Sequence, residues 1–164
     1  MYQNFIGIDI SKRTFAVGYH GEHIVKNYTN LPQGFKDFLK DFKHLLKNGL
    51  VILETTGGYE MELIRFLQKH QCSVHRANTR KVKHFIRSFG KLGKSDAIDA
   101  IGLAHYGFER HKSLDEYVEH PDKKLLKLVN RRSELKQMVV QEKNRLKGPD
   151  LCGLQKSFEA VIKA

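Results

Sequence analysis

The alternation of apolar and polar positions over the first thirty residues is typical of β-strands. "NFIGIDI" alternates and is rich in β-branched residues, and "RTFAVGYH" continues the pattern. "GEH" suits a turn, after which "IVKNYTN" forms a third extended run. Because the connections are short, we expect an antiparallel meander of three strands.

The pattern then changes to the spacing of helices that alternate with buried strands. "LPQGFKDFLKDFKHLL" has apolar residues along one helix face, with Pro32 near its start. "LVILE" is a continuous apolar run, typical of a buried parallel strand. "YEMELIRFLQKH" then predicts a helix, "CSVHRA" a strand and "TRKVKHFIRSF" a helix. This order predicts an α/β fold with a mixed five-stranded sheet flanked by helices.

The segment 121–147 has a different apolar repeat. Seven positions follow alternating steps of three and four, and two of them are charged: Leu125, Leu128, Arg132, Leu135, Val139, Glu142 and Leu146. This heptad pattern predicts a long coiled-coil-like helix that pairs with a second chain or with its own domain. A surface helix packed on the domain explains the pattern equally well. Gly148 and Pro149 end the helix.

Composition adds a polyanion as the expected partner. The net charge is +11 and the sequence pI is about 9.7, so nucleic acid and a merely basic protein are comparable interpretations. Cys72 and Cys152 lack metal-type spacing and are expected to be free thiols. Because no secretory leader pattern or apolar run of about 20 residues occurs, we expect a cytoplasmic protein with no membrane segment.

Two acidic residues occupy unusual positions in the predicted sheet. Asp9 lies within the first strand, where an ionised carboxylate is costly unless it is paired or binds metal. Glu54 ends "LVILE", and ligands of open α/β sheets gather at the carboxyl ends of strands. If these strands are neighbours, the two carboxylates face each other. Asp9 as a strand-end residue bonded to the next turn is the alternative.

The stretch "GKSDAIDAIGLA" adds Asp96 and Asp99, which share one helix face. Helix-start chemistry alone explains Asp96, because acids complement the helix dipole and Ser95 suits the N-cap. Four carboxylates at one end of a sheet would instead bind Mg²⁺ or Mn²⁺, and two such ions about 4 Å apart promote phosphodiester cleavage. The sequence lacks the His or Cys clusters that bind zinc.

A basic run without acids precedes these aspartates, and a solvated helix face usually mixes both signs. We therefore expect the run to contact phosphates. Lys12 is a further candidate, although an exposed turn lysine is the simpler interpretation. For Phe85 and Phe89 the helical spacing favours a core role over base stacking. The predicted nucleic-acid contacts are Lys12, Arg76, Arg80, Lys81, Lys83, Arg87, Lys91 and Lys94.

Four stretches together resemble the N-terminal half of a bacterial transposase group. They are "FIGIDISKRTFAV", "ETTGGYEMELIRFL", "VHRANTRKVKHFIRSFGKLGKSDAIDAIGLAHY" and "LKLVNRRSELKQMVVQEKNRL". In order and spacing they are similar to the Asp-Glu-Asp-Asp insertion-sequence transposases, which include the pilin-gene invertases. The resemblance implies a RuvC-like fold of the ribonuclease-H superfamily. It also implies that Asp9, Glu54, Asp96 and Asp99 hold a divalent metal that acts on DNA.

The resemblance further implies a recombinase that exchanges DNA strands with the help of a structured guide RNA. It assigns residues 1–112 to the catalytic domain and 113–148 to a coiled-coil segment where protomers form a dimer or larger homo-oligomer. Residues 149–164 would be a tail or the start of a second domain, which carries a nucleophilic serine in the family. The alternative is a catalytically incomplete module that binds nucleic acid and dimerises through 121–147.

Overall fold

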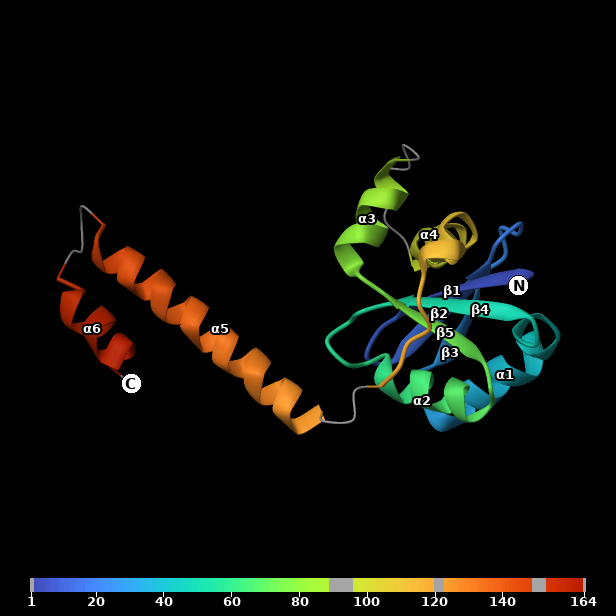
Figure 1. The fold of residues 1–164 in the computed structure, drawn as a ribbon, viewed down its shortest axis with the longest axis horizontal. Helices are drawn as coiled ribbons and strands as arrows, with labels where there is room; N and C mark the ends of the chain where they lie inside the picture. Colours follow the sequence, from blue (N-terminus) through green and yellow to red (C-terminus); the bar gives the residue numbers. More distant parts are fainter. Residues whose placement is uncertain (1, 89–95, 120–122, 149–152, 164) are drawn as a thin grey trace. The chain divides into compact units, whose positions relative to one another are not determined.

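The computed structural model describes residues 2–88, 96–119, 123–148 and 153–163. The chain divides into two compact units, Met1–Val118 and Glu119–Ala164. The first unit contains a sheet with helices on both faces, and the second contains two helices (Figure 1).

The sheet of the first unit is mixed, as the sequence predicts. Its spatial order is β3-β2-β1-β4-β5, so the strand after the first helix lies beside β1. The meander pairs antiparallel, whereas β1, β4 and β5 run parallel. The strands are β1 (Asn4–Ile10), β2 (Thr14–Tyr19), β3 (Lys26–Thr29), β4 (Gly49–Glu54) and β5 (Ser73–Ala77).

Helices cover both faces of this sheet because its central strands are apolar on both sides. α1 (Pro32–Leu46) and α2 (Met61–Lys69) cover one face, where Ile6, Ile8 and Val51 join the larger apolar core. α3 (Thr79–Ser88) and α4 (Asp96–Arg110) lie on the other face (Figure 1). There a smaller core brings together residues such as Phe5 and Leu103.

Two glycines let α4 lie directly on the sheet. A Cβ atom on Gly7 of β1 would lie 2.0 Å from the Ala100 carbonyl oxygen. A Cβ atom on Gly18 of β2 would lie 3.1 Å from the Ile101 side chain. A larger residue at Gly7 would push the helix away. The first turns of α4 are therefore held close to the strand that carries Asp9.

The first unit continues beyond residue 112, where the sequence analysis places its end. After α4, a 3-10 helix, η1 (His111–Ser113), leads into an extended segment. The Tyr117 backbone N–H donates to the Val74 carbonyl over 2.7 Å, and the Gln68 side chain donates to the Tyr117 carbonyl over 2.6 Å. These bonds attach the segment to β5 and α2, so the unit ends at Val118.

The second unit consists of two helices in contact, α5 (Lys123–Leu146) and α6 (Gln155–Lys163). The predicted long helix is thus confirmed over α5. Leu125, Leu128 and Leu135 of its heptad positions remain 45–59% exposed within the chain. Pairing with a second chain stays a prediction. Neither unit has, in its described parts, a helix both long and apolar enough to cross a membrane.

Candidate metal and nucleic-acid site

Asp9 and Glu54 lie side by side where the neighbouring strands β1 and β4 end. We call this end of the sheet, with Asp99 of α4 nearby, the carboxylate edge. Ile8 of β1 is in register with Leu53 of β4 in the parallel pair, so the next residue on each strand is at the same level. Side chains alternate along a strand, so Asp9 shares the sheet face of Gly7, and Glu54 shares that of Ile52. This is the face that α4 covers. Both acids are half-buried.

Asp99 approaches this pair from the first turns of α4, next to Ala100, which lies against Gly7. Burial raises the pKa of Glu54 above its ordinary value, and the charge of Asp99 raises it further, whereas Lys83 acts in the opposite direction. No hydrogen bond or ion pair within the described residues neutralises the Glu54 carboxylate. Glu54 thus lies beside Asp9 in the sheet and within electrostatic range of Asp99 on α4.

This donor set fits Mg²⁺ or Mn²⁺, which are hard cations that take carboxylate oxygens. Within the described residues, however, no three acidic, His or Cys side chains are close enough to hold one ion. Asp96 begins α4, but its side chain lies outside the described part of the structure. The described carboxylates therefore do not by themselves form a coordination site in this structure.

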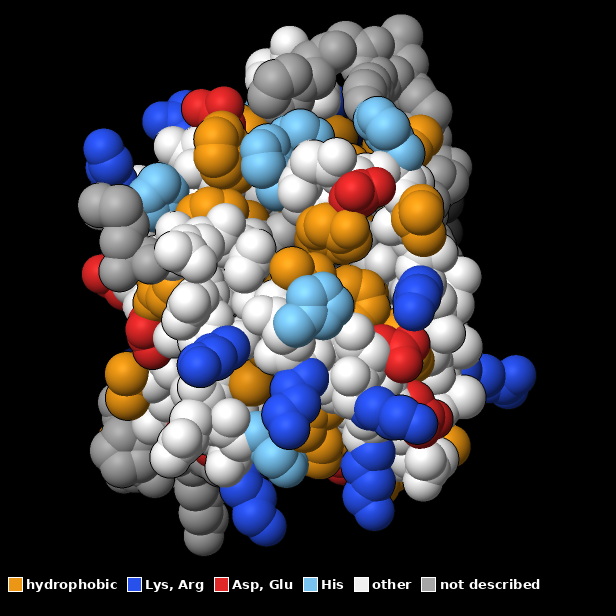
Figure 2. Space-filling view, turned by 90° about the vertical axis from the view of Figure 1, so that its right-hand side faces the viewer, with side chains coloured by type: hydrophobic (Ala, Val, Ile, Leu, Met, Phe, Trp, Pro, Cys, Tyr) orange, Lys and Arg blue, Asp and Glu red, His pale blue; other side chains and the backbone are white. Residues whose placement is uncertain are grey.

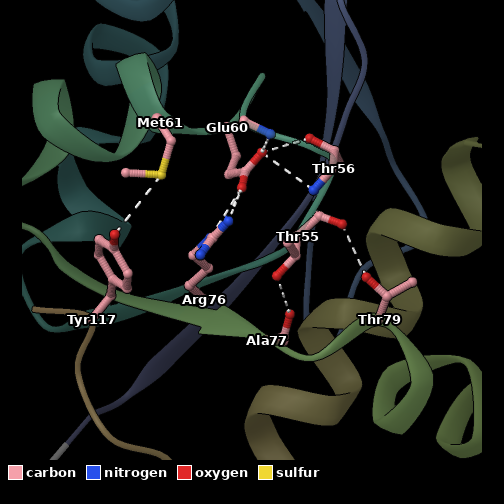
Figure 3. A network of polar contacts seen from close by, with 9 residues as sticks. Thr55, Thr56, Glu60, Met61, Arg76, Ala77, Thr79 and Tyr117 are labelled. Carbon is pink, nitrogen blue, oxygen red and sulfur yellow. Dashed lines mark hydrogen bonds and ion pairs between the residues drawn. The ribbon is translucent and has the colours of Figure 1, made fainter. Parts of the chain in front are cut away.

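The loop after Glu54 is organised around Glu60, a residue to which the sequence analysis assigns no role. Glu60 is fully buried. Its carboxylate accepts bonds from the Thr56 hydroxyl over 2.7 Å, the Thr56 N–H over 3.2 Å and the Gly58 N–H over 3.0 Å (Figure 3). Gly57 and Gly58 have φ values of 75° and 113°, which favour glycine. The "TTGG" turn therefore has a structural function.

Arg76 of β5 completes the Glu60 network. Its Nε and Nη2 atoms donate to one Glu60 oxygen over 3.0 and 2.5 Å, and its guanidinium lies 5.7 Å from the centre of the Tyr117 ring (Figure 3). Burial opposes ionisation of Glu60, but its hydrogen bonds and Arg76 outweigh burial, so the pKa of Glu60 is lowered. The predicted phosphate contact of Arg76 is untested, but its guanidinium is already engaged.

The predicted basic residues of α3 lie on two different faces of that helix. Val82 is buried, and Ile86 packs where α4 carries Gly102. Lys83 lies toward Glu54, as its effect on the Glu54 pKa indicates. By helical spacing, Arg80 and Arg87 share that side. Lys81 faces the other way, into a separate groove.

This groove has a volume of about 740 Å³ and lies between α3, β5 and the end of α4. His84 and Arg110 add further positive or titratable side chains, and Asp115 is the acid that lines it. Phe85 packs edge-on against Tyr106, with ring centroids 5.3 Å apart, which agrees with the predicted core role. Sequence reasoning missed Arg110 because the groove combines four separate segments.

The remaining predicted contacts are placed only in part. Lys12 is exposed in the turn that follows β1, just beyond the strand end that carries Asp9. Lys91, Lys94 and Phe89 lie outside the described residues.

Comparison with known proteins agrees with this architecture. A transposase family model, that of DEDD transposases of the IS110 type, matches residues 6–149. Pilin gene-inverting proteins of Moraxella bovis and Moraxella lacunata are each 29% identical over 150 residues. The match covers 88% of this chain and 47% of each relative, so the chain spans about half their length.

The fold also matches a solved structure. RuvC of Thermus thermophilus, in complex with a Holliday junction substrate, superposes with a TM-score of 0.51 at 13% identity. The match covers 71% of this chain and all of RuvC. The first unit therefore has the RuvC-like, ribonuclease-H-type fold that the resemblance implies.

Proposed function

Because this chain belongs to the DEDD transposases of the IS110 type, we propose that its first unit cuts and exchanges DNA strands at the carboxylate edge. Asp9, Glu54, Asp96 and Asp99 are the proposed ligands of Mg²⁺ or Mn²⁺. A role in DNA recombination follows from the family. The metal site and the individual residues are the proposal.

The single observation that carries this proposal is the placement of Asp9 and Glu54 at the same level on neighbouring strands, with Asp99 within electrostatic range of Glu54. Asp9 and Glu54 come from adjacent parallel strands in register. Asp99 comes from α4, which packs closely against Gly7 of β1. Burial raises the pKa of Glu54, Lys83 partly offsets this, and the charge of Asp99 adds to it, so a bound cation would stabilise the ionised carboxylate. The chemistry supplied by Mg²⁺ or Mn²⁺ there is polarisation of a phosphodiester and activation of the attacking oxygen.

Basic residues around the edge would position the DNA. Lys83, Arg80 and Arg87 are proposed to contact phosphates beside the carboxylates, and Lys12 to contact them from the turn after β1. Such cations offset the repulsion between substrate phosphates and clustered carboxylates. Lys81 is proposed to hold the strand where it continues into the groove behind α3. Lys91 and Lys94 complete the predicted surface.

The partners of the chain are part of the proposal as well. The resemblance to the family implies a further domain that supplies a nucleophilic serine, and the chain matches 47% of the length of its pilin gene-inverting relatives. Residues 149–164 would lead into that domain. We also propose that 121–147 joins protomers and that a structured guide RNA binds. The competing proposal is a module that binds nucleic acid and dimerises without cleaving.

The proposal is tested by recombination in vitro with the full-length protein, Mg²⁺ and DNA that carries the ends of its element. We expect Glu54→Gln and Asp9→Asn to lower product formation at least about 100-fold, which corresponds to about 2.7 kcal/mol or more of lost transition-state stabilisation. Binding of the same DNA should change by less than about threefold.

Glu62→Gln is the matched control, because Glu62 is an exposed acid on α2. Its variant should recombine at the wild-type rate. Near-normal recombination by the Glu54 and Asp9 variants would refute the catalytic proposal and favour the binding module.

A further inference from the structure

One side of α1 carries a row of lysines. Their spacing places them on a single helix face, within an arc of about 60°, and all are exposed. The row consists of Lys36, Lys40, Lys43 and, directly after the helix, Lys47.

The acids of the same helix compensate this lysine row only in part: the pKa of Asp41 is lowered mainly by its hydrogen bonds with Tyr28 and Lys26, and the charge of Lys40 adds to this. Asp41 is bonded to Lys26 over 3.1 Å and to the Tyr28 hydroxyl over 2.9 Å. Asp37 accepts a bond from Gln33 over 2.9 Å. By helical spacing both acids lie on the neighbouring face. Like charges at a spacing of four weaken a helix slightly, and a bound polyanion would relieve this repulsion.

The row forms one wall of a groove of about 920 Å³ between α1 and α2. Lys69 and His70 contribute from α2 and its end, and Leu39, Leu46 and Phe66 also line the groove. Among the described residues that line it, none is acidic. Figure 2, in which the α1 and α2 side lies below, shows lysine and arginine side chains gathered in that lower part.

We propose that this groove binds the phosphate backbone of a second nucleic-acid segment. α1 and α2 lie on the sheet face opposite α4, so the bound segment is distinct from the one at the carboxylate edge. The lysine row spans about 16 Å at 1.5 Å per residue, close to five base-pair steps of 3.4 Å. The inference rests on the proposed function only in taking nucleic acid as the polyanion.

Charge and exposure distinguish nucleic acid from a membrane surface. A peripheral membrane site pairs basic residues with exposed apolar anchors. The apolar residues of this groove are buried or half-buried, and none is among the large exposed apolar side chains of the described chain. An uninterrupted positive row with a recessed apolar floor suits a phosphate backbone.

The test measures binding in the full chain with Glu54→Gln as background, so that cleavage plays no part. The variant is Lys36→Gln/Lys40→Gln/Lys43→Gln, because glutamine keeps helix propensity. Its control, Lys112→Gln/Lys156→Gln/Lys163→Gln, removes the same charge at exposed sites outside the groove. The probes are 30-base-pair DNA, 30-nucleotide single-stranded DNA and a 30-base-pair RNA duplex, titrated over a range of salt concentrations.

We expect the groove variant to bind at least one probe roughly 30-fold more weakly at 0.1 M salt, with the slope of log affinity against log salt reduced by about three. The control should change by less than about threefold. The probe that is affected identifies the segment as DNA or RNA.

Equal losses in variant and control would overturn the inference. So would loss of binding to vesicles of phosphatidylserine with no change for any nucleic acid. A thermal unfolding measurement checks that the groove variant is folded. Its melting temperature should be at least as high as that of the Glu54→Gln background, because repulsion between the lysines is removed. Because no cleavage is measured, a failure here leaves the proposed function of the carboxylate edge standing.

Discussion

Glu54 and Glu60 are two glutamates six residues apart that occupy opposite electrostatic environments. Glu60 is fully buried, yet it accepts bonds from Thr56, Gly58 and Arg76, and its pKa is lowered. Glu54 is half-buried, and burial raises its pKa; the charge of Asp99 adds to this, while Lys83 partly offsets it. The end of β4 thus carries a carboxylate that the fold destabilises, and the loop after it contains one that the fold stabilises.

The difference indicates how structural and functional acids can be distinguished. A buried charge is costly, so a structural carboxylate is surrounded by donors, as Glu60 is. A carboxylate whose pKa is raised by burial, with a neighbouring acid adding to it, gains nothing for the fold, and perturbed groups of this kind gather at functional sites. Glu60 therefore holds the loop in place, whereas Glu54, at the end of β4, has the properties expected of a functional acid.

The largest expected effect is on the Glu60 network. Arg76→Ala leaves a buried carboxylate without its cation and should lower the free energy of unfolding by about 3–5 kcal/mol. Urea denaturation followed by circular dichroism measures this change. Arg80→Ala, at an exposed position of α3, should stay within about 0.5 kcal/mol. A loss below about 1 kcal/mol for Arg76→Ala would mean that Glu60 is not held by this ion pair.

A smaller effect, with a defined pH dependence, is expected for Glu60→Gln. The pKa of Glu60 is lowered in the fold, so its charge stabilises the protein above the ordinary pKa of glutamate. That contribution is lost as pH falls through the lowered pKa. The variant should be about 2 kcal/mol less stable at pH 7, and the difference should shrink in acid. A constant difference across pH would contradict the assignment.

The smallest expected effect has the opposite sign. The pKa of Glu54 is raised in the fold, so folding favours its protonated form. Stability therefore falls as pH rises from the ordinary pKa of glutamate through the raised one. Without metal, Glu54→Gln should melt roughly 2 °C higher than the wild type at pH 7, and the two should converge in acid. A variant that is less stable at pH 7 would show that Glu54 is structural.

Much of the fold follows from the sequence because its signals are local. The alternation in β1, the apolar run of β4 and the helical spacing in α1 each predict their element, and all five strands are where the pattern places them. Asp9 and Glu54 could be paired from sequence because a meander followed by a crossover places these two strands side by side. The structure adds the register of the two strands, which places Asp9 and Glu54 opposite each other.

Features that combine distant segments could not be predicted in this way. Glu60 follows "TTGG" at a helix start, where an acid normally complements the helix dipole, and its partner Arg76 comes from a strand 16 residues later. Likewise, Tyr117 joins the first unit through a bond to Val74 that no local pattern indicates. The spacing of the lysines on α1 is visible in the sequence, but the groove that they border is formed together with α2.

The central claim is that the edge formed by Asp9, Glu54 and Asp99 holds a divalent metal, and a crystal of the DNA complex grown with Mn²⁺ tests it most directly. Anomalous scattering should place at least one Mn²⁺ about 2.2 Å from oxygens of Asp9 and Glu54, with Asp96 or Asp99 completing the site. The same crystals of the Glu54→Gln variant should lose that peak or weaken it strongly. Well-ordered carboxylates with no anomalous peak between them, while DNA is bound, would contradict the account.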